Sequence, residues 1–306
     1  CGFSWTLWKE FKELSEWADV IHYQFPWPFA DFMALTRQPS SKPYIVSYQS
    51  DIIRQNGLNK LYQPLMKRFL AKAAAIVATS QKYIVSSPVL SNLKQPVALI
   101  PNGIESELDS ASYEKEKKRY EDVYGRNFFL FLGVFRYYKG LIYLLEAALQ
   151  TGLDVVIAGD GAQAGVLHQF VKEHDLTNVH FLGHVTKQEK YALIDISTAL
   201  VLPSSERSEA YGMVLLEAAR QSTPMISTEL ESGTSYINSH NETGLVVAPK
   251  NSTELAAAMR YMADNEETVK LMSASAKKRF DQSFTGEIMG KCYADLYHSV
   301  LVEIEL

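Results

Sequence analysis

Two glutamates, Glu209 and Glu217, stand eight positions apart where an apolar helical pattern begins. An ionised carboxylate accepts hydrogen bonds and donates none, which suits the hydroxyl groups of a sugar or a ribose. At about 1.5 Å of rise per residue, the spacing lets the two carboxylates address two ends of one elongated ligand. The alternative is that both are solvated charges on a helix surface, which is the usual place for an isolated pair of glutamates.

A strand and a helix must position these glutamates. The apolar run at 198–204 predicts a buried strand, and 211–221 predicts a helix because its apolar residues recur at helical spacing. In an open parallel sheet, the turn between them lies at the carboxyl edge, where doubly wound folds bind ligands. The first amides of the helix lack intrahelical partners and lie at the positive end of its dipole, so this turn suits a phosphate.

The whole pattern resembles a known signature. Glu209 and Glu217 flank Tyr211, Gly212 and Met213, and they follow a strand that ends in Pro-Ser, as in the retaining glycosyltransferases of family 4 with the GT-B fold. The resemblance implies that Glu217 holds the ribose hydroxyls of a nucleotide-sugar donor. It also implies that Glu209, with the amides around Tyr211 and Gly212, holds the donor sugar, and that Met213 lines the same donor site.

The resemblance runs in order through nearly all 306 residues and is strongest from 128 to 249. It implies an α/β protein of two Rossmann-like domains that face each other across a cleft, with the donor held mainly by the second domain and the acceptor by the first. The implied reaction moves a hexose, expected to be mannose from GDP-mannose, to a lipid-linked or surface polysaccharide with retention of the anomeric configuration. In this family the departing phosphate itself assists the acceptor hydroxyl.

A cationic element precedes this motif in the chain. The stretch from Gly133 resembles the family's Gly-Arg-Leu-x-x-x-Lys-Gly element: Lys139 and Gly140 match, whereas Val134 replaces the arginine, and Arg136 follows two places later. We expect Arg136 to substitute from this shifted position; the alternative is that Lys139 and helix amides suffice. Such cations stabilise the charge of the departing diphosphate. They can take the place of a metal ion, so no metal or other cofactor is expected.

A Gly-x-Gly pair, Gly159 and Gly161, ends the strand-like run at 154–160. In the resembling family this turn lies beneath the nucleotide, which makes Gly159, together with Gly133 of the cationic element, a candidate donor-site residue. A single Gly-x-Gly pair is equally consistent with a plain strand-to-helix turn.

The acceptor side is expected at Gln49 and Asp51, which end another strand-like run. The resembling family has His-Ser-Asp here, and Gln49 stands in the place of the histidine. Glutamine hydrogen-bonds a sugar hydroxyl but takes no proton, so no general-base role transfers to this position.

Alternating strand-like and helical patterns indicate βαβ units and parallel sheets. We expect the first domain at 1–108, a charged linker with a surface helix at 109–126, the second domain at 127–285, and a helix at 286–306 that crosses back to the first domain. The chain opens inside a helical pattern rather than with the strand and glycine-rich turn of GT-B enzymes. We therefore expect the first domain to be incomplete at its amino end.

Composition excludes several classes. The 30 basic and 35 acidic residues give a net charge of −5, which does not favour a nucleic-acid surface. The two cysteines, Cys1 and Cys292, are too few for a disulfide framework or a zinc cluster, which favours a reducing, cytoplasmic location. The apolar face at 5–14 is typical of a helix packed on a sheet; peripheral contact with the inner face of the cytoplasmic membrane is its second interpretation.

Two rival functions stay open. Gln49 and Val134 depart from the family pattern, which suits a non-catalytic subunit that binds nucleotide sugars or glycans. The other rival is a UDP-sugar-using transferase or epimerase of the same fold. An epimerase of the UDP-N-acetylglucosamine type needs acids and bases at the sugar, and none stands in a recognisable place.

Overall fold

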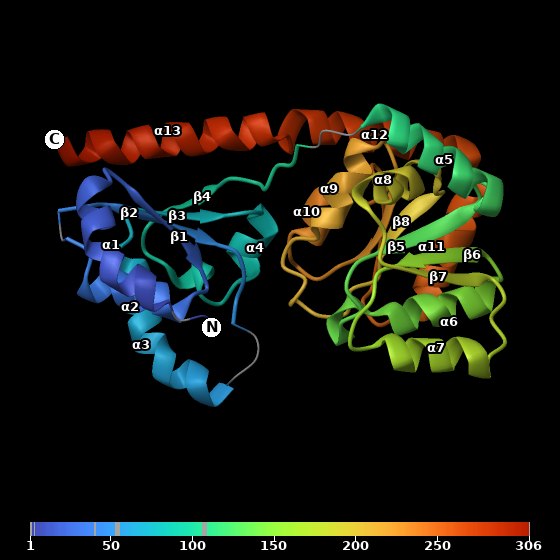
Figure 1. The fold of residues 1–306 in the computed structure, drawn as a ribbon, viewed down its shortest axis with the longest axis horizontal. Coiled ribbons are helices and arrows are strands. Elements are labelled where there is room, and N and C mark those ends of the chain that lie inside the picture. Colours follow the sequence, from blue (N-terminus) through green and yellow to red (C-terminus); the bar gives the residue numbers. More distant parts are fainter. Residues whose placement is uncertain (1, 3, 40, 53–55, 106–108, 306) are drawn as a thin grey trace. The chain divides into compact units, whose positions relative to one another are not determined.

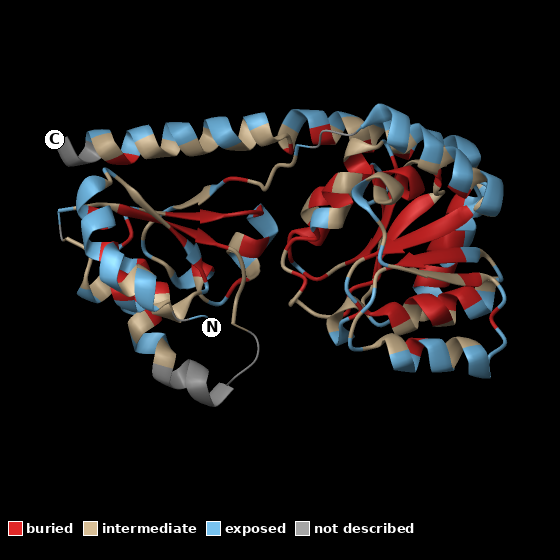
Figure 2. Cartoon of the chain, in the orientation of Figure 1, coloured by how far each residue is buried: buried red, intermediate tan, exposed pale blue. Residues whose placement is uncertain are grey.

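The computed structural model describes residues 2–305 with gaps at 3, 40, 53–55 and 106–108 (Figure 1). The chain divides into two compact units, Cys1–Asn102 with Glu287–Leu306, and Gly103–Gly286. Each unit has its own parallel sheet with helices on both faces. Buried residues gather along the strands of each sheet, as parallel strands covered on both faces require (Figure 2).

The first unit has a four-stranded parallel sheet of order β1-β2-β3-β4. Its described elements are α1 (Trp5–Trp17), β1 (Ile21–Phe25), α2 (Pro28–Thr36), β2 (Tyr44–Tyr48), α3 (Asn56–Lys72), β3 (Ala75–Ala78), α4 (Gln81–Ser86), the 3-10 helix η1 (Leu90–Asn92), β4 (Val97–Leu99) and, from the end of the chain, α13 (Gly286–Glu305). Strands and helices alternate along this unit, as the sequence pattern predicted.

Hydrogen bonds join α13 to this sheet. The Nδ1 atom of His22 on β1 lies 2.7 Å from the hydroxyl of Tyr297, and its Nε2 atom lies 2.7 Å from the hydroxyl of Ser47 on β2. Ser47 also lies 2.7 Å from the hydroxyl of Tyr293. The carboxyl-terminal helix, expected at 286–306, therefore belongs to the first unit from Glu287 onwards.

The predicted apolar face of α1 is only partly buried in the structure. Phe11 is buried, and the ring of Trp8 stacks on Phe32 at a centroid distance of 5.8 Å. Trp5 and Leu14 are 60% and 50% exposed. Part of the face thus packs in the unit and part does not. Within the described residues, no helix has both the length and the apolar character that a bilayer span requires.

The second unit has a six-stranded parallel sheet of order β10-β9-β8-β5-β6-β7. The first three strands of the unit extend the sheet from β5 to one side, and the last three extend it from β8 to the other side, so the strand order reverses between β5 and β8. This is the doubly wound order of Rossmann folds, whose ligands bind at the reversal. The elements are α5 (Ser110–Tyr124), β5 (Phe128–Leu132), the 3-10 helix η2 (Tyr137–Lys139), α6 (Leu141–Thr151), β6 (Asp154–Ala158), α7 (Ala164–Glu173), β7 (Val179–Gly183), α8 (Lys187–Ile196), β8 (Ala199–Leu202), α9 (Met213–Arg220), β9 (Met225–Thr228), α10 (Thr234–Ile237), β10 (Gly244–Val247), α11 (Ser252–Asp264) and α12 (Glu266–Ser283).

The central strand β5 shows how the second core forms. Its five residues are all buried, and they alternate between the two faces as strand geometry requires. Phe129 and Phe131 pack in a cluster with α6, α7 and α11, whereas Phe128 and Leu130 pack in a cluster with α5, α8 and α9.

The segment 109–126, expected to be a linker with a surface helix, does form the helix α5, and this helix belongs to the second unit. Tyr120 is 5% exposed and belongs to the core cluster of that unit. The hydroxyl of Tyr113 donates to Asp195 on α8 at 2.7 Å, and that of Tyr120 donates to Glu189 at 2.9 Å. The high charge of the segment suggested a surface connection, but tyrosines spaced along one side anchor it to α8.

Candidate functional site

The loops that follow β5 and β8 meet at the reversal of the strand order. Residues 133–140 leave β5, and residues 203–212 leave β8, its hydrogen-bonded neighbour in the sheet. The amide of Ser205 donates to the carbonyl oxygen of Tyr138 at 2.7 Å, which fixes one loop to the other. The sequence predicted functional residues in both loops, and the sheet brings them together.

Glycines allow the close approach of these loops. A Cβ atom added at Gly159 would lie 2.0 Å from the carbonyl oxygen of Gly133, and one added at Gly140 would lie 2.0 Å from that of Pro203. Gly159 and Gly140 also have φ angles of +135° and +66°, which side chains disfavour. Gly133 and Gly159 therefore allow the backbones to pack closely at this edge. Their contacts with the donor nucleotide sugar stay a prediction.

Lys139 and Glu209 form the central contact of the site. The Nζ atom of Lys139 lies 2.5 Å from Oε2 of Glu209, and the two side chains are 14% and 10% exposed. Ser204 donates its hydroxyl to the same carboxylate oxygen at 3.0 Å, and Ser232 donates to the carbonyl oxygen of Glu209 at 2.9 Å. A poorly hydrated ion pair is weak evidence for stability. Its place at the ligand-binding edge of the sheet favours a functional role.

Arg136 lies next to this pair in the chain. It immediately precedes η2, its side chain is exposed, and it forms no ion pair with any residue in the part of the chain that the structure describes. Burial raises the pKa of Tyr138; the charge of Glu209 adds to the rise, and Arg136 opposes it. Arg136 and Glu209 therefore both lie within electrostatic range of the Tyr138 phenol, which places a second cation near the carboxylate.

The turn before α9 leaves the first amides of the helix without a side-chain cap. Gly212 precedes the helix with φ +85°. A Cβ atom at Gly212 would lie 2.9 Å from Cδ2 of Leu202. The Tyr211 side chain is 6% exposed in the core, so only its backbone is available to a ligand, whereas Met213 is 43% exposed.

Glu217 lies on α9 and pairs with a residue that the sequence analysis missed. Its Oε1 atom lies 2.5 Å from Nζ of Lys190 on α8. Lys190 stands in the first turn of α8, where a cation opposes the helix dipole. That unfavourable position was the one sequence signal for Lys190. Ser204 belongs to the Pro-Ser end of the strand that the signature includes, whereas Ser232 carried no comparable signal, because serines are common in turns.

The acceptor-side residues lie at the carboxyl edge of the first sheet, in the other unit. One carboxylate oxygen of Asp51 accepts from the hydroxyls of Tyr48 at 2.9 Å and Ser87 at 2.6 Å. The side-chain amide of Gln49 donates to Gln24 at 3.0 Å. Asp51 is thus engaged in holding its own segment, and the acceptor roles of Gln49 and Asp51 stay predictions.

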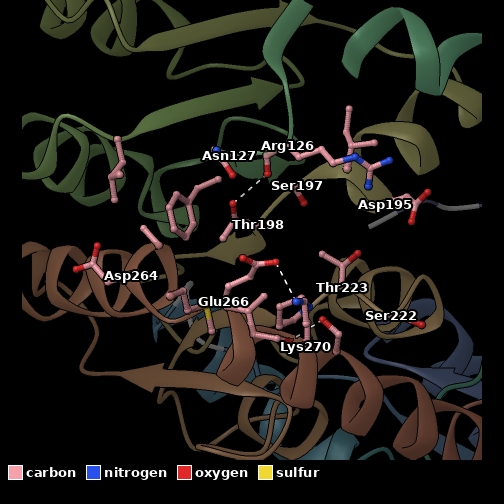
Figure 3. A pocket seen from close by; sticks show the side chains of 18 residues that line it. Arg126, Asn127, Asp195, Ser197, Thr198, Ser222, Thr223, Asp264, Glu266 and Lys270 are labelled. Atoms are coloured by element: carbon pink, nitrogen blue, oxygen red, sulfur yellow. Dashed lines mark hydrogen bonds and ion pairs between the residues drawn. The ribbon is translucent and has the colours of Figure 1, made fainter. Parts of the chain in front are cut away.

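A pocket of about 680 Å³ lies at the opposite edge of the second sheet (Figure 3). Its lining includes Asn127, Thr198 and Pro224, which precede β5, β8 and β9. The hydroxyl of Thr198 donates to the carbonyl oxygen of Arg126 at 3.2 Å on its wall. None of the predicted site residues lines this pocket.

Both halves of the chain match families of known proteins. Residues 112–279 match Glycosyl transferases group 1, and residues 1–108 match Glycosyltransferase Family 4. The chain is 40% identical over 98% of its length, and 80% of the relative's, to O-antigen chain mannosyltransferase C of Escherichia coli. It is 43% identical over 93% of its length, and 74% of the relative's, to D-rhamnosyltransferase WbpZ of Pseudomonas aeruginosa.

Two solved structures are similar in fold. HepE of Anabaena, in complex with UDP, has a TM-score of 0.82 at 17% identity over 96% of this chain and 82% of its own. Sucrose-phosphate synthase of Thermosynechococcus elongatus has a TM-score of 0.80 at 18% identity over 96% and 77%. The predicted GT-B fold is confirmed, and the chain belongs to the group 1 glycosyltransferases.

Proposed function

We propose that this glycosyltransferase moves a mannosyl unit from GDP-mannose to a lipid-linked or growing surface polysaccharide with retained anomeric configuration. The observation that carries the proposal is the Lys139–Glu209 pair at the reversal of the strand order. Two relatives at 40% and 43% identity are named as an O-antigen mannosyltransferase and a D-rhamnosyltransferase. D-rhamnose is 6-deoxy-D-mannose, so both names favour a donor with the mannose ring configuration.

The proposed roles follow from charge and hydrogen-bonding capacity. Glu209 and the amides of the turn hold the donor sugar, and Glu217 holds the ribose. Lys139 and Arg136 neutralise the diphosphate as the bond between the anomeric carbon and the phosphate oxygen breaks. The acceptor oxygen bonds to the anomeric carbon on the same face, and its proton passes to the departing phosphate oxygen. No protein base is needed in this scheme, so Gln49 is compatible with activity.

Two further parts of the proposal concern cofactor and location. Lys139 and Arg136 supply the positive charge that a metal ion would otherwise bring, so transfer needs no metal. We also propose that the enzyme works in the cytoplasm and contacts the inner face of the membrane that carries its lipid-linked acceptor. The exposed Trp5 and Leu14 of α1 support such contact.

A non-catalytic nucleotide-sugar-binding subunit is the second candidate, because Val134 stands where the family pattern has arginine. Turnover separates the two. A panel of GDP-mannose, GDP-D-rhamnose and UDP-glucose should be tested for slow hydrolysis and for transfer, with the anomeric configuration of the product read by NMR.

We expect the protein to hydrolyse one of the two GDP-sugars. The Glu209→Gln variant should lose this hydrolysis, while its circular dichroism spectrum stays unchanged. The control is Glu242→Gln, which changes an exposed glutamate in a turn of the same unit. Binding of a nucleotide sugar without hydrolysis or transfer would support the non-catalytic subunit. Transfer near the wild-type rate by Glu209→Gln would overturn the site assignment.

A further inference from the structure

We infer that Lys190 is a positioning residue for the ribose of the donor nucleotide, and that it acts by holding the carboxylate of Glu217. This inference rests on the proposed role of Glu217. Lys190 falls outside both motifs that resemble the family, and only the packing of α8 against α9 brings it to Glu217.

The contact is close and partly shielded from water. The Nζ atom of Lys190 lies 2.5 Å from Oε1 of Glu217, and the two side chains are 28% and 20% exposed. Among the described residues, none donates a hydrogen bond to the other carboxylate oxygen, Oε2. Glu217 is therefore held at one oxygen and available at the other.

The stability of α8 does not explain the lysine. The helix already has a complete capping box, in which Thr186 accepts from the amide of Glu189 at 3.3 Å and Glu189 accepts from the amide of Thr186 at 2.8 Å. Lys190 adds a positive charge to the first turn, where the dipole opposes it. Its amine also lies 4.9 Å from the centre of the Tyr191 ring, which limits its freedom. The favourable partner of this charge is Glu217.

The chemistry of a ribose explains why Glu217 needs such a partner. A carboxylate has about four lone-pair sites, so it can accept from Lys190 and still accept from two neighbouring hydroxyls. A free glutamate loses rotamer freedom when it binds a diol, and this opposes binding. The ion pair with Lys190 orders Glu217 beforehand.

The test compares nucleotides with and without a ribose hydroxyl. Binding of GDP, 2′-deoxy-GDP and 3′-deoxy-GDP, and of the corresponding uridine nucleotides, should be measured by calorimetry on the wild-type chain, Lys190→Met, Lys190→Arg and Glu217→Ala. We expect Lys190→Met to weaken binding of the preferred ribonucleotide about 10-fold, the value of one charge-assisted hydrogen bond. The affinity of Lys190→Met for the deoxynucleotides should change little. The ratio of its affinities for the ribonucleotide and the deoxynucleotides, which is the preference for ribose, should therefore fall. Lys190→Arg should restore the preference.

The control is Lys277→Met, because Lys277 pairs with Asp281 within α12 and its loss should leave all affinities unchanged. Equal weakening of ribo- and deoxynucleotides by Lys190→Met would show a merely structural role and overturn the inference. An unchanged preference in Lys190→Met together with a lost preference in Glu217→Ala would overturn it while the ribose role of Glu217 survives. An unchanged preference in Glu217→Ala would overturn that role itself.

Discussion

The amine of Lys139 lies 2.5 Å from the carboxylate of Glu209, although the two residues belong to loops that follow different strands. In this arrangement each charge neutralises the other. A diphosphate that binds to Lys139 must share its amine with Glu209, and a donor sugar must share the carboxylate with Lys139. If Lys139 holds the diphosphate and Glu209 holds the sugar, as we propose, the pair couples these two parts of one donor.

The two cations of the site should differ in their effects. Lys139→Met leaves Glu209 poorly hydrated and unpaired, so we expect the free energy of unfolding to fall by about 3 kcal/mol. The rate of transfer should fall about 100-fold or more, because the diphosphate loses its main cation and meets an uncompensated carboxylate. Urea unfolding and initial rates check both changes.

Arg136→Gln changes an exposed side chain, so its free energy of unfolding should stay within about 0.5 kcal/mol of the wild-type value. Its affinity for GDP should nevertheless fall, and the fall should shrink as salt screens the charges. Calorimetry at low and high ionic strength measures this. An affinity equal to that of the wild-type chain at low salt would show that Arg136 does not replace the family's arginine.

Transfer should not depend on a divalent cation. If Lys139 and Arg136 neutralise the diphosphate, the initial rate measured with an excess of EDTA should equal the rate without it. Adding Mg²⁺ or Mn²⁺ afterwards should not raise the rate. A rate that disappears with EDTA and returns with one of these ions would contradict the proposed role of the two cations.

The packing of the site loops should depend on Gly159. Gly159→Ala places a Cβ atom against the carbonyl oxygen of Gly133 in a disfavoured backbone conformation, so we expect a loss of about 3 kcal/mol in the free energy of unfolding. Gly165→Ala is the matched control: its Cβ atom meets no atom within 4 Å, and it lies on α7. There the change should stabilise by about 0.5 kcal/mol. Equal effects at the two positions would show that the loops are not closely packed.

A buried carboxyl group should make the first unit sensitive to pH. Asp31 on α2 is 1% exposed, and burial raises its pKa from 3.8 to about 7 although Tyr62 donates a hydrogen bond to it. Because the folded state holds the proton more tightly, the stabilising contribution is complete below pH 3.8 and is lost as the pH rises through about 7. The shift corresponds to at most about 4 kcal/mol.

Asp31→Asn should remove this dependence, because an amide does not ionise in this range. Thermal unfolding of the variant should change less between pH 5 and pH 8 than that of the wild-type chain, and the variant should gain relative to the wild type at the higher pH. Parallel pH profiles of the two proteins would show that Asp31 does not titrate in the folded state over this range.

Local sequence patterns determined much of this protein. Strands such as β5 and β8 are apolar runs of strand length, and α9 follows a glycine with apolar residues at helical spacing, so each could be located without tertiary information. The Glu209 and Glu217 motif and the element that ends at Lys139 were visible for the same reason, since each motif occupies one continuous stretch. Family membership followed from these stretches.

Only the tertiary structure decided which of these residues meet. Lys139 reaches Glu209 because β8 lies beside β5 in the sheet, and strand order is a property of the whole unit rather than of any segment. Lys190 reaches Glu217 only through the packing of α8 on α9. The charged segment around Tyr120 was expected to be a linker with a surface helix, because composition does not reveal that Tyr113 and Tyr120 donate hydrogen bonds to α8. Periodicity specifies what a segment becomes, whereas burial against distant segments specifies its partners.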